Sequence, residues 1–205
     1  MSGDLYIVDQ PTLAAFCASL QGVPWLALDT EFVREQTYYP QLGLIQIASA
    51  DQVASIDPLA LPSLDPLLER LYDPTVTKLL HAGQQDLEIF FHLCGAAPAP
   101  VFDTQLAALI LGQGDQIGYA SLVRRMLGVE LDKAHTRADW RHRPLEPEWL
   151  RYAADDVRYL PELYRQQRAA LEERGWLDAL AEDFQRLCHP DRYRLQPWES
   201  WRRVR

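Results

Sequence analysis

Residues 25–32 read Trp-Leu-Ala-Leu-Asp-Thr-Glu-Phe, and this stretch decides the fold class. Its first four residues are apolar, as in a buried strand, and two carboxylates follow, Asp29 and Glu31. In an extended chain these two side chains point to the same face, with their Cα atoms about 7 Å apart. Like charges held that close raise each other's pKa unless a cation lies between them. The stretch therefore predicts a core strand that ends in two paired carboxylates, although a strand that ends in a polar turn would leave the same pattern.

Apolar segments on either side of this stretch predict the rest of the sheet. Residues 42–48 and 53–56 follow it across short turns and indicate a three-strand antiparallel meander. Two later strands, residues 76–80 and 101–103, each lead into a helix and are expected to be parallel. Helices are expected over residues 11–20, 64–71, 104–111, 120–127 and 177–187. The pattern predicts one α/β domain with a mixed five-stranded sheet flanked by helices, and it leaves residues 5–8 as a short strand of the scaffold.

Composition restricts the classes of protein to consider. The 205 residues are 48% apolar and 24% charged, which is typical of one globular domain with a sizeable core. We find no secretory signal and no apolar run long enough to span a bilayer, so we expect a cytoplasmic protein that does not associate with membranes. The three cysteines, Cys17, Cys94 and Cys188, are far apart and suggest neither a disulfide framework nor a zinc cluster.

The net charge of −9 argues, taken alone, against a nucleic-acid-binding protein. Basic residues nevertheless gather in two segments, residues 124–143 and 186–205. The first segment is equally consistent with a surface that contacts phosphate and with an ordinary solvated face. Two bound divalent cations would offset four of the nine negative charges, so part of the acidity is explained if four carboxylates bind metal.

A third carboxylate, Asp86, follows the strand at residues 76–80. The apolar residues after it recur at helical spacing and end at Gly95, so Asp86 lies in or near the first turn of a helix. An acid in that position is favoured by the helix dipole alone. Junctions between a strand and a helix at the carboxyl edge of a sheet are, however, also where open α/β folds gather their ligands. His81, at the start of this junction, is expected to have a structural hydrogen-bonding role.

A late helix supplies the remaining candidates. Pro147 begins it, and Pro161 is expected to kink it or to divide it in two. Tyr152 and Asp156 are one turn apart on this helix and share an edge. The neighbouring Asp155 lies about 100° around the helix axis, so we expect it to face solvent or a basic side chain.

Four carboxylates therefore converge on one predicted cleft: Asp29, Glu31, Asp86 and Asp156. They cannot all ionise there without cations, and oxygen-only ligands favour Mg²⁺ or Mn²⁺ over zinc. Two such ions about 3.5–4 Å apart are the usual arrangement for phosphodiester displacement. The hydroxyl of Tyr152 would orient the attacking water, because its reference pKa near 10 makes full general-base catalysis less favourable.

Several segments carry a resemblance to a known family. They are Leu-Asp-Thr-Glu-Phe at residues 28–32 with Tyr-Tyr-Pro-Gln-Leu-Gly-Leu-Ile-Gln at 38–46, His-Ala-Gly-Gln-Gln-Asp-Leu at 81–87, Asp-Trp-x-x-Arg-Pro-Leu at 139–145, and Tyr-Ala-Ala-Asp-Asp-Val at 152–157. In this order and spacing they resemble the DEDDy 3′ to 5′ exonucleases, and most closely the catalytic domain of the bacterial ribonuclease D family. All five functional positions of the family match: Asp29, Glu31, Asp86, Tyr152 and Asp156.

This resemblance implies a ribonuclease H-like fold and an exoribonuclease that trims the 3′ ends of RNA, such as tRNA precursors, and releases 5′-mononucleotides. The implied cofactors are two Mg²⁺ or Mn²⁺ ions, and the implied partner is RNA with a free 3′ end; no obligate protein partner is evident. We assign residues 1–190 to the exonuclease domain and residues 191–205 to a basic tail. In the family such a tail usually leads toward helical HRDC domains.

Two other functions remain as alternatives. A non-catalytic nucleic-acid-binding module on the same fold would be expected to have lost at least one of the acids, and none is lost. A structural metal-binding protein would not need Tyr152. An enzyme accounts for all five positions.

Overall fold

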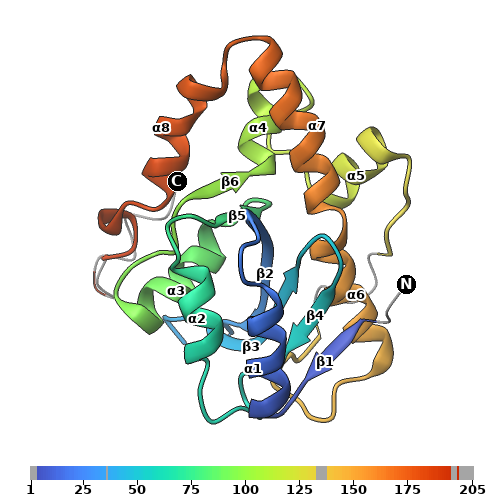
Figure 1. The fold of residues 1–205 in the computed structure, drawn as a ribbon, viewed down its shortest axis with the longest axis vertical. Helices are drawn as coiled ribbons and strands as arrows, with labels where there is room; N and C mark the ends of the chain where they lie inside the picture. Colours follow the sequence, from blue (N-terminus) through green and yellow to red (C-terminus); the bar gives the residue numbers. More distant parts are fainter. Residues whose placement is uncertain (1–3, 36, 133–137, 195–197, 199–205) are drawn as a thin grey trace.

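The computed structural model describes residues 4–35, 37–132, 138–194 and 198. Within them, six strands form one mixed sheet in the order β1-β4-β3-β2-β5-β6 (Figure 1). The strands are β1 (Leu5–Ile7), β2 (Trp25–Val33), β3 (Gln41–Ala48), β4 (Val53–Ile56), β5 (Thr77–Leu80) and β6 (Val101–Asp103). Strand β3 lies between β2 and β4 and is antiparallel to both, whereas β5 pairs in parallel with β2 and β6 pairs in parallel with β5. The predicted meander and parallel strands are confirmed.

The sheet differs from the sequence-based expectation at two places. It has six strands and not five, because β1 pairs in parallel with β4 and buries Ile7 completely. In addition, β2 does not end at the carboxylates. It continues to Val33 because β3 pairs with it along this whole length, with a shift in register between Glu31 and Phe32. The two carboxylates are thus held inside a strand, where their positions are more closely fixed than at a turn.

Eight α-helices in the described residues surround the sheet, close to the bounds that the sequence predicts. They are α1 (Gln10–Ser19), α2 (Asp65–Leu71), α3 (Gln84–Cys94), α4 (Thr104–Ile110), α5 (Tyr119–Leu127), α6 (Pro147–Arg158), α7 (Leu160–Glu173) and α8 (Leu177–Leu187), and a short 3₁₀ turn, η1 (Pro190–Arg192), follows. Pro161 divides the long helix in two, as expected, and Tyr159 separates α6 from α7. No helix of the described ranges is long and apolar enough to cross a membrane.

Helix α6, which carries the candidate residues Tyr152 and Asp156, lies against the centre of the sheet. It packs against β2, β3 and β4, while α4, α5 and α8 gather around α7 (Figure 1). On the face of α6 that packs against the sheet, Ala153 and Val157 are completely buried. Strand β2 pairs with β5 only from Trp25 to Ala27, so beyond this point its β5 side is open to the first turn of α3. Helices α6 and α3 thus both reach the second half of β2.

Candidate active site

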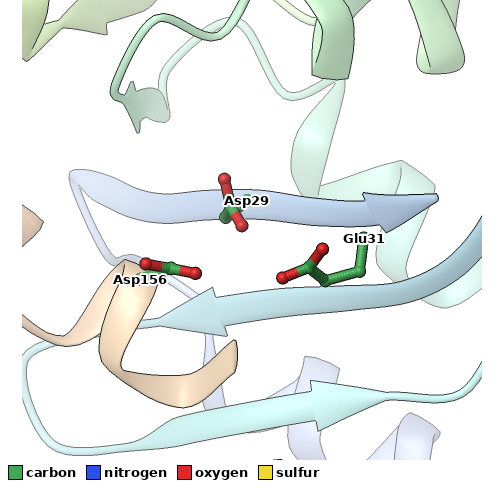
Figure 2. Close-up of side chains that lie close together, drawn as sticks. All are labelled: Asp29, Glu31 and Asp156. Atoms are coloured by element: carbon green, nitrogen blue, oxygen red, sulfur yellow. The ribbon is translucent and has the colours of Figure 1, made fainter. Parts of the chain in front are cut away.

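Asp29 and Glu31 on β2 meet Asp156 on α6. One carboxylate oxygen from each of the three residues lies within 4.8 Å of the others (Figure 2). Asp29 and Glu31 share a face because they are two residues apart in an extended strand, and that face is the one which α6 covers. Asp156 is more than 120 residues from the other two in sequence, and the three side chains form one partly buried group.

The negative charge of this group is costly for the protein. Burial raises the pKa of Asp29 well above its ordinary value, and the charges of Asp86, Asp156 and Glu31 raise it further. Burial, followed by Asp156 and Asp86, raises the pKa of Glu31 to about 9. Burial, followed by Asp155 and Asp86, raises the pKa of Asp156 to about 7. Among the described residues, every side-chain charge that shifts these three pKa values appreciably is another carboxylate, so the group favours binding of an external cation.

Asp86 approaches the same group from α3. Its carboxylate accepts a hydrogen bond from Thr30 Oγ1 at 2.5 Å, and its side chain is buried. Burial raises the pKa of Asp86 to about 6, although hydrogen bonds from Thr30 act in the opposite direction. Asp86 is outside the close group of three, but its charge acts on Asp29, Glu31 and Asp156. The structure thus brings all four predicted carboxylates together, with Asp86 on one side.

Tyr152 lies beside these carboxylates on α6. Its half-buried ring stacks on Trp140, with ring centroids 6.3 Å apart and an interplanar angle of 28°. Burial raises the pKa of its hydroxyl above the ordinary value, and the charges of Asp156, Glu31 and Asp29 add to this effect. The hydroxyl therefore stays protonated at neutral pH. Asp155 turns away and accepts a hydrogen bond from Arg158 Nε at 2.8 Å, as the helical spacing predicts.

The residues around Trp140 fix the position of Tyr152. Trp140 is buried against Leu44, Leu145 and Ala153. The close approach requires a glycine in β3, because a Cβ at Gly43 would lie 2.6 Å from the carbonyl oxygen of Trp140. The surface on which Tyr152 rests is therefore closely packed on the β3 side.

Arg143 fastens the same segment to the sheet. It donates to both carboxylate oxygens of Asp57, at 2.6 and 2.8 Å, and also to the carbonyl oxygens of Gly43 and Trp140. Tyr6 donates a further hydrogen bond to Asp57 at 2.8 Å. Arg143 is thus a structural residue, and it is no longer a candidate for contact with phosphate.

The other arginine and lysine residues of the two basic segments either have an ion-pair or hydrogen-bond partner or lie outside the described residues. Arg124 forms an exposed ion pair with Glu130, and Arg125 and Arg141 donate to Gln113 and Gln41. In the C-terminal segment, Arg186 and Arg194 pair with nearby acids, and Arg192 donates to Gln84. Lys133, Arg137, Arg202, Arg203 and Arg205 lie outside the described residues. His81 has the structural role expected of it, with hydrogen bonds to Thr104 Oγ1 and to the carbonyl of Ile117.

Comparison with known proteins gives consistent results. Residues 6–172 match the family model described as 3′-5′ exonuclease. Ribonuclease D of Sphingobium indicum is 46% identical over 202 residues, which are 97% of this chain and 52% of that protein. The chain therefore spans about half the length of the curated relatives it matches.

Two solved structures show how far the likeness extends in three dimensions. The crystal structure of Escherichia coli RNase D, described as an exoribonuclease involved in structured RNA processing, has a TM-score of 0.90 and 40% identity, and the match covers 98% of this chain and 54% of that one. Brucella melitensis NrnC with bound Mg²⁺ has a TM-score of 0.79 and 27% identity, with coverage of 97% and 96%. The ribonuclease H-like fold that the sequence predicts is confirmed by these neighbours.

Proposed function

Because the chain belongs to the ribonuclease D family of 3′-5′ exonucleases, we propose that it hydrolyses RNA from a free 3′ end and releases 5′-mononucleotides. The observation that carries the proposal is the close group of Asp29, Glu31 and Asp156, with Asp86 and the Tyr152 hydroxyl beside it. A non-catalytic binding module is not favoured, because such a module needs neither an uncompensated acidic group nor a tyrosine packed against its edge.

The side chains present fit a site for divalent cations. All donors in the group are carboxylate oxygens, the ligand type that Mg²⁺ and Mn²⁺ prefer. Asp29, Glu31 and Asp156 are close enough to hold one ion, and Asp86, whose charge acts on Asp29, is the further carboxylate available to a second ion. When bound, two such ions supply a water of lowered pKa and stabilise the leaving 3′ oxygen. Mg²⁺ in the related Brucella protein supports the choice of ion.

The chain's own contribution to the reaction is positioning. Tyr152 keeps its proton, so its hydroxyl can hydrogen-bond the attacking water without taking the proton itself. The stacked Trp140 holds the ring of Tyr152 in place, and Arg143 holds the Trp140 segment against the sheet. Asp156 is one turn further along α6 than Tyr152, and its carboxylate lies with those of Asp29 and Glu31. A water placed between Tyr152 and the carboxylates would be lined up for attack on the terminal phosphodiester.

We further propose that the substrate is a small structured RNA with a single-stranded 3′ tail, such as a tRNA precursor, processed in the cytoplasm. Support comes from the Escherichia coli relative, which is described as an exoribonuclease involved in structured RNA processing. The reaction class fits the site, because a cation held by Asp29, Glu31 and Asp156 would act on the phosphodiester and not on a particular base. Selection for a 3′ end would come from access to that point.

An assay with end-labelled RNA tests the proposal. With Mg²⁺, a 5′-labelled single-stranded RNA should shorten progressively, whereas a 3′-labelled RNA should release its label at once as a mononucleotide. EDTA should abolish both reactions, and a circular RNA of the same sequence should remain intact. Internal fragments from the circular RNA, or equal degradation in EDTA, would contradict the proposal.

A further inference from the structure

Gln46, in the middle of β3, is completely buried, and neither atom of its side-chain amide has a hydrogen-bond partner within the described part of the chain. A buried amide without partners lowers the stability of the folded state, and native structures contain few of them. An apolar side chain of similar size, such as Met, would fill the same space without this cost. The amide of Gln46 therefore calls for a role other than packing.

The register of the sheet places Gln46 directly beside the carboxylate group. Gln46 is the cross-strand partner of Asp29 on β2, and on its other side it is the partner of Ser55 on β4. Residues directly opposite each other in antiparallel strands share a face and have Cβ atoms about 4.5–5.5 Å apart. Asp29, Gln46 and Ser55 thus form a row across three strands, on the face that α6 covers. A carboxylate lies at one end of the row and a buried hydroxyl lies at the other.

Within the described residues a second glutamine, Gln167 on α7, is also fully buried, and it shows what a structural glutamine does in this protein. Its Nε2 donates to the carbonyl oxygen of Thr104 at 3.0 Å and to Gln113 Oε1 at 2.9 Å, so it joins α7 to α4 and to the turn that follows α4. Gln46 joins nothing in this way. The two residues have the same chemistry and the same burial, and only the one beside Asp29 has an amide nitrogen without a partner.

We propose that Gln46 is a positioning residue for the cation site, in which its amide N–H donates to the carboxylate of Asp29 and sets the direction of that ligand. This inference rests on the proposed function, since it presumes that Asp29 binds a metal ion. The terminal torsion of glutamine is soft, so the amide can turn toward Asp29 without leaving its rotamer, and its Oε1 then faces the hydroxyl of Ser55. A donor of this kind fixes the orientation of a ligating carboxylate and strengthens metal binding.

The test compares metal affinity with stability in Gln46→Met, which keeps the size of the side chain and removes the donor. Mn²⁺ affinity, measured by electron paramagnetic resonance without RNA, should weaken about 10- to 100-fold. The thermal midpoint in EDTA should be unchanged or higher by about 2–4 °C, because in the metal-free protein both polar atoms of the Gln46 amide are buried without a partner among the described residues, and the substitution removes them. A residue with a purely structural role would lower the midpoint when replaced.

Two further variants make the result decisive. Gln46→Asn keeps the amide but shortens its reach by one methylene, and it should also weaken Mn²⁺ binding. Gln167→Met is the matched control: it should lower the thermal midpoint, because it leaves Thr104 and Gln113 without their donor, and it should leave Mn²⁺ affinity unchanged.

The outcomes separate this inference from the proposed function. If wild-type protein binds Mn²⁺ and both Gln46 variants bind it equally tightly, the positioning role of Gln46 is overturned and the proposed function stands. If wild-type protein itself fails to bind Mn²⁺, the proposed function fails first and the inference falls with it.

Discussion

The single carboxylate of Asp57 and the carboxylate group of Asp29, Glu31 and Asp156 lie at the same sheet but have opposite electrostatic surroundings. Asp57, just after β4, is buried, but it accepts hydrogen bonds from Arg143, Tyr6 and the backbone N–H of Leu59. Burial alone would raise the pKa of Asp57, yet these hydrogen bonds and the charge of Arg143 outweigh it and hold the pKa below its ordinary value. In the carboxylate group at β2, burial and like charges act together, and the pKa values are raised.

The difference shows where the protein supplies its own cation and where it leaves one to be supplied. Arg143 forms a bidentate ion pair with Asp57, and it also donates a hydrogen bond to the carbonyl oxygen of Trp140. At the carboxylate group, the described residues provide other acids instead of an arginine or lysine. Binding of an external ion would offset the stability lost there, and such a loss of stability in favour of function is common at active sites.

The largest expected effect separates two adjacent acids on α6. Asp156→Asn removes a carboxylate from the group and should reduce exonuclease activity by on the order of 10³-fold or more, or about 4 kcal/mol of transition-state stabilisation. Asp155→Asn is the matched control, because this residue pairs with Arg158 and should keep activity and remain within about 0.5 kcal/mol of wild-type stability. Rates on 5′-labelled RNA measure the contrast; equal losses in the two variants would mean that the α6 register is misassigned.

Tyr152→Phe tests the hydroxyl while it preserves the ring. The ring should still stack on Trp140, so metal binding and stability should stay close to wild type. Activity should fall by about 10²- to 10⁴-fold, the range expected for one group that transfers a proton or orients a water. Turnover at the wild-type rate in this variant would reduce Tyr152 to a packing residue.

Removing one carboxylate from each region should change the free energy of unfolding in opposite directions. Asp57→Asn removes the partner of Arg143 and should lower the free energy of unfolding by about 1–3 kcal/mol, less than for a fully buried pair because Arg143 is partly exposed. Asp29→Asn removes one of several repelling charges and should raise it by about 1 kcal/mol in EDTA. Urea unfolding of both variants measures the difference, and two changes of the same sign would break the comparison.

The smallest effect is a pH dependence that belongs to Asp57. Because its folded-state pKa is lower than its ordinary value of 3.8, the ion pair contributes stability above pH 3.8. This contribution is lost as the pH falls below 3.8 through the folded-state pKa. The stability difference between wild type and Asp57→Asn should therefore be constant from pH 5 to 7 and should shrink below pH 3.8. A difference that does not begin to shrink as the pH falls below 3.8 would show that the ion pair is not its origin.

The sequence predicts that the carboxylates of the candidate active site come together, because a local sequence pattern indicates each of them. Asp29 and Glu31 interrupt an apolar strand, and Tyr152 and Asp156 are one helical turn apart, so spacing alone places each pair on one face. The pairing of Arg143 with Asp57 is not marked in this way. The two residues are 86 positions apart, and nothing in either local pattern indicates the other.

The sequence also does not indicate that β1 joins the sheet or that Gln46 lies beside Asp29, because both depend on strand pairing between distant residues. Residues 5–7 are too short a segment to indicate by themselves that they join the sheet; their pairing with β4 decides it. Gln46 is one polar residue in an apolar strand, and only the register with Asp29 shows that it stands beside the carboxylates. The signal that could have drawn attention to it was its polarity within the apolar run Leu-Gly-Leu-Ile-Gln-Ile-Ala, at residues 42–48.

Thermal unfolding with and without Mn²⁺ tests most directly whether the carboxylate group is completed by an external cation. At a free Mn²⁺ concentration of 100 times the dissociation constant, binding to the folded state alone adds about 2.7 kcal/mol, which should raise the midpoint of wild type by about 5–10 °C over EDTA. Asp156→Asn should lose most of this rise, whereas Asp57→Asn should keep it from a lower starting midpoint. Equal midpoints for wild type in Mn²⁺ and in EDTA would contradict the account.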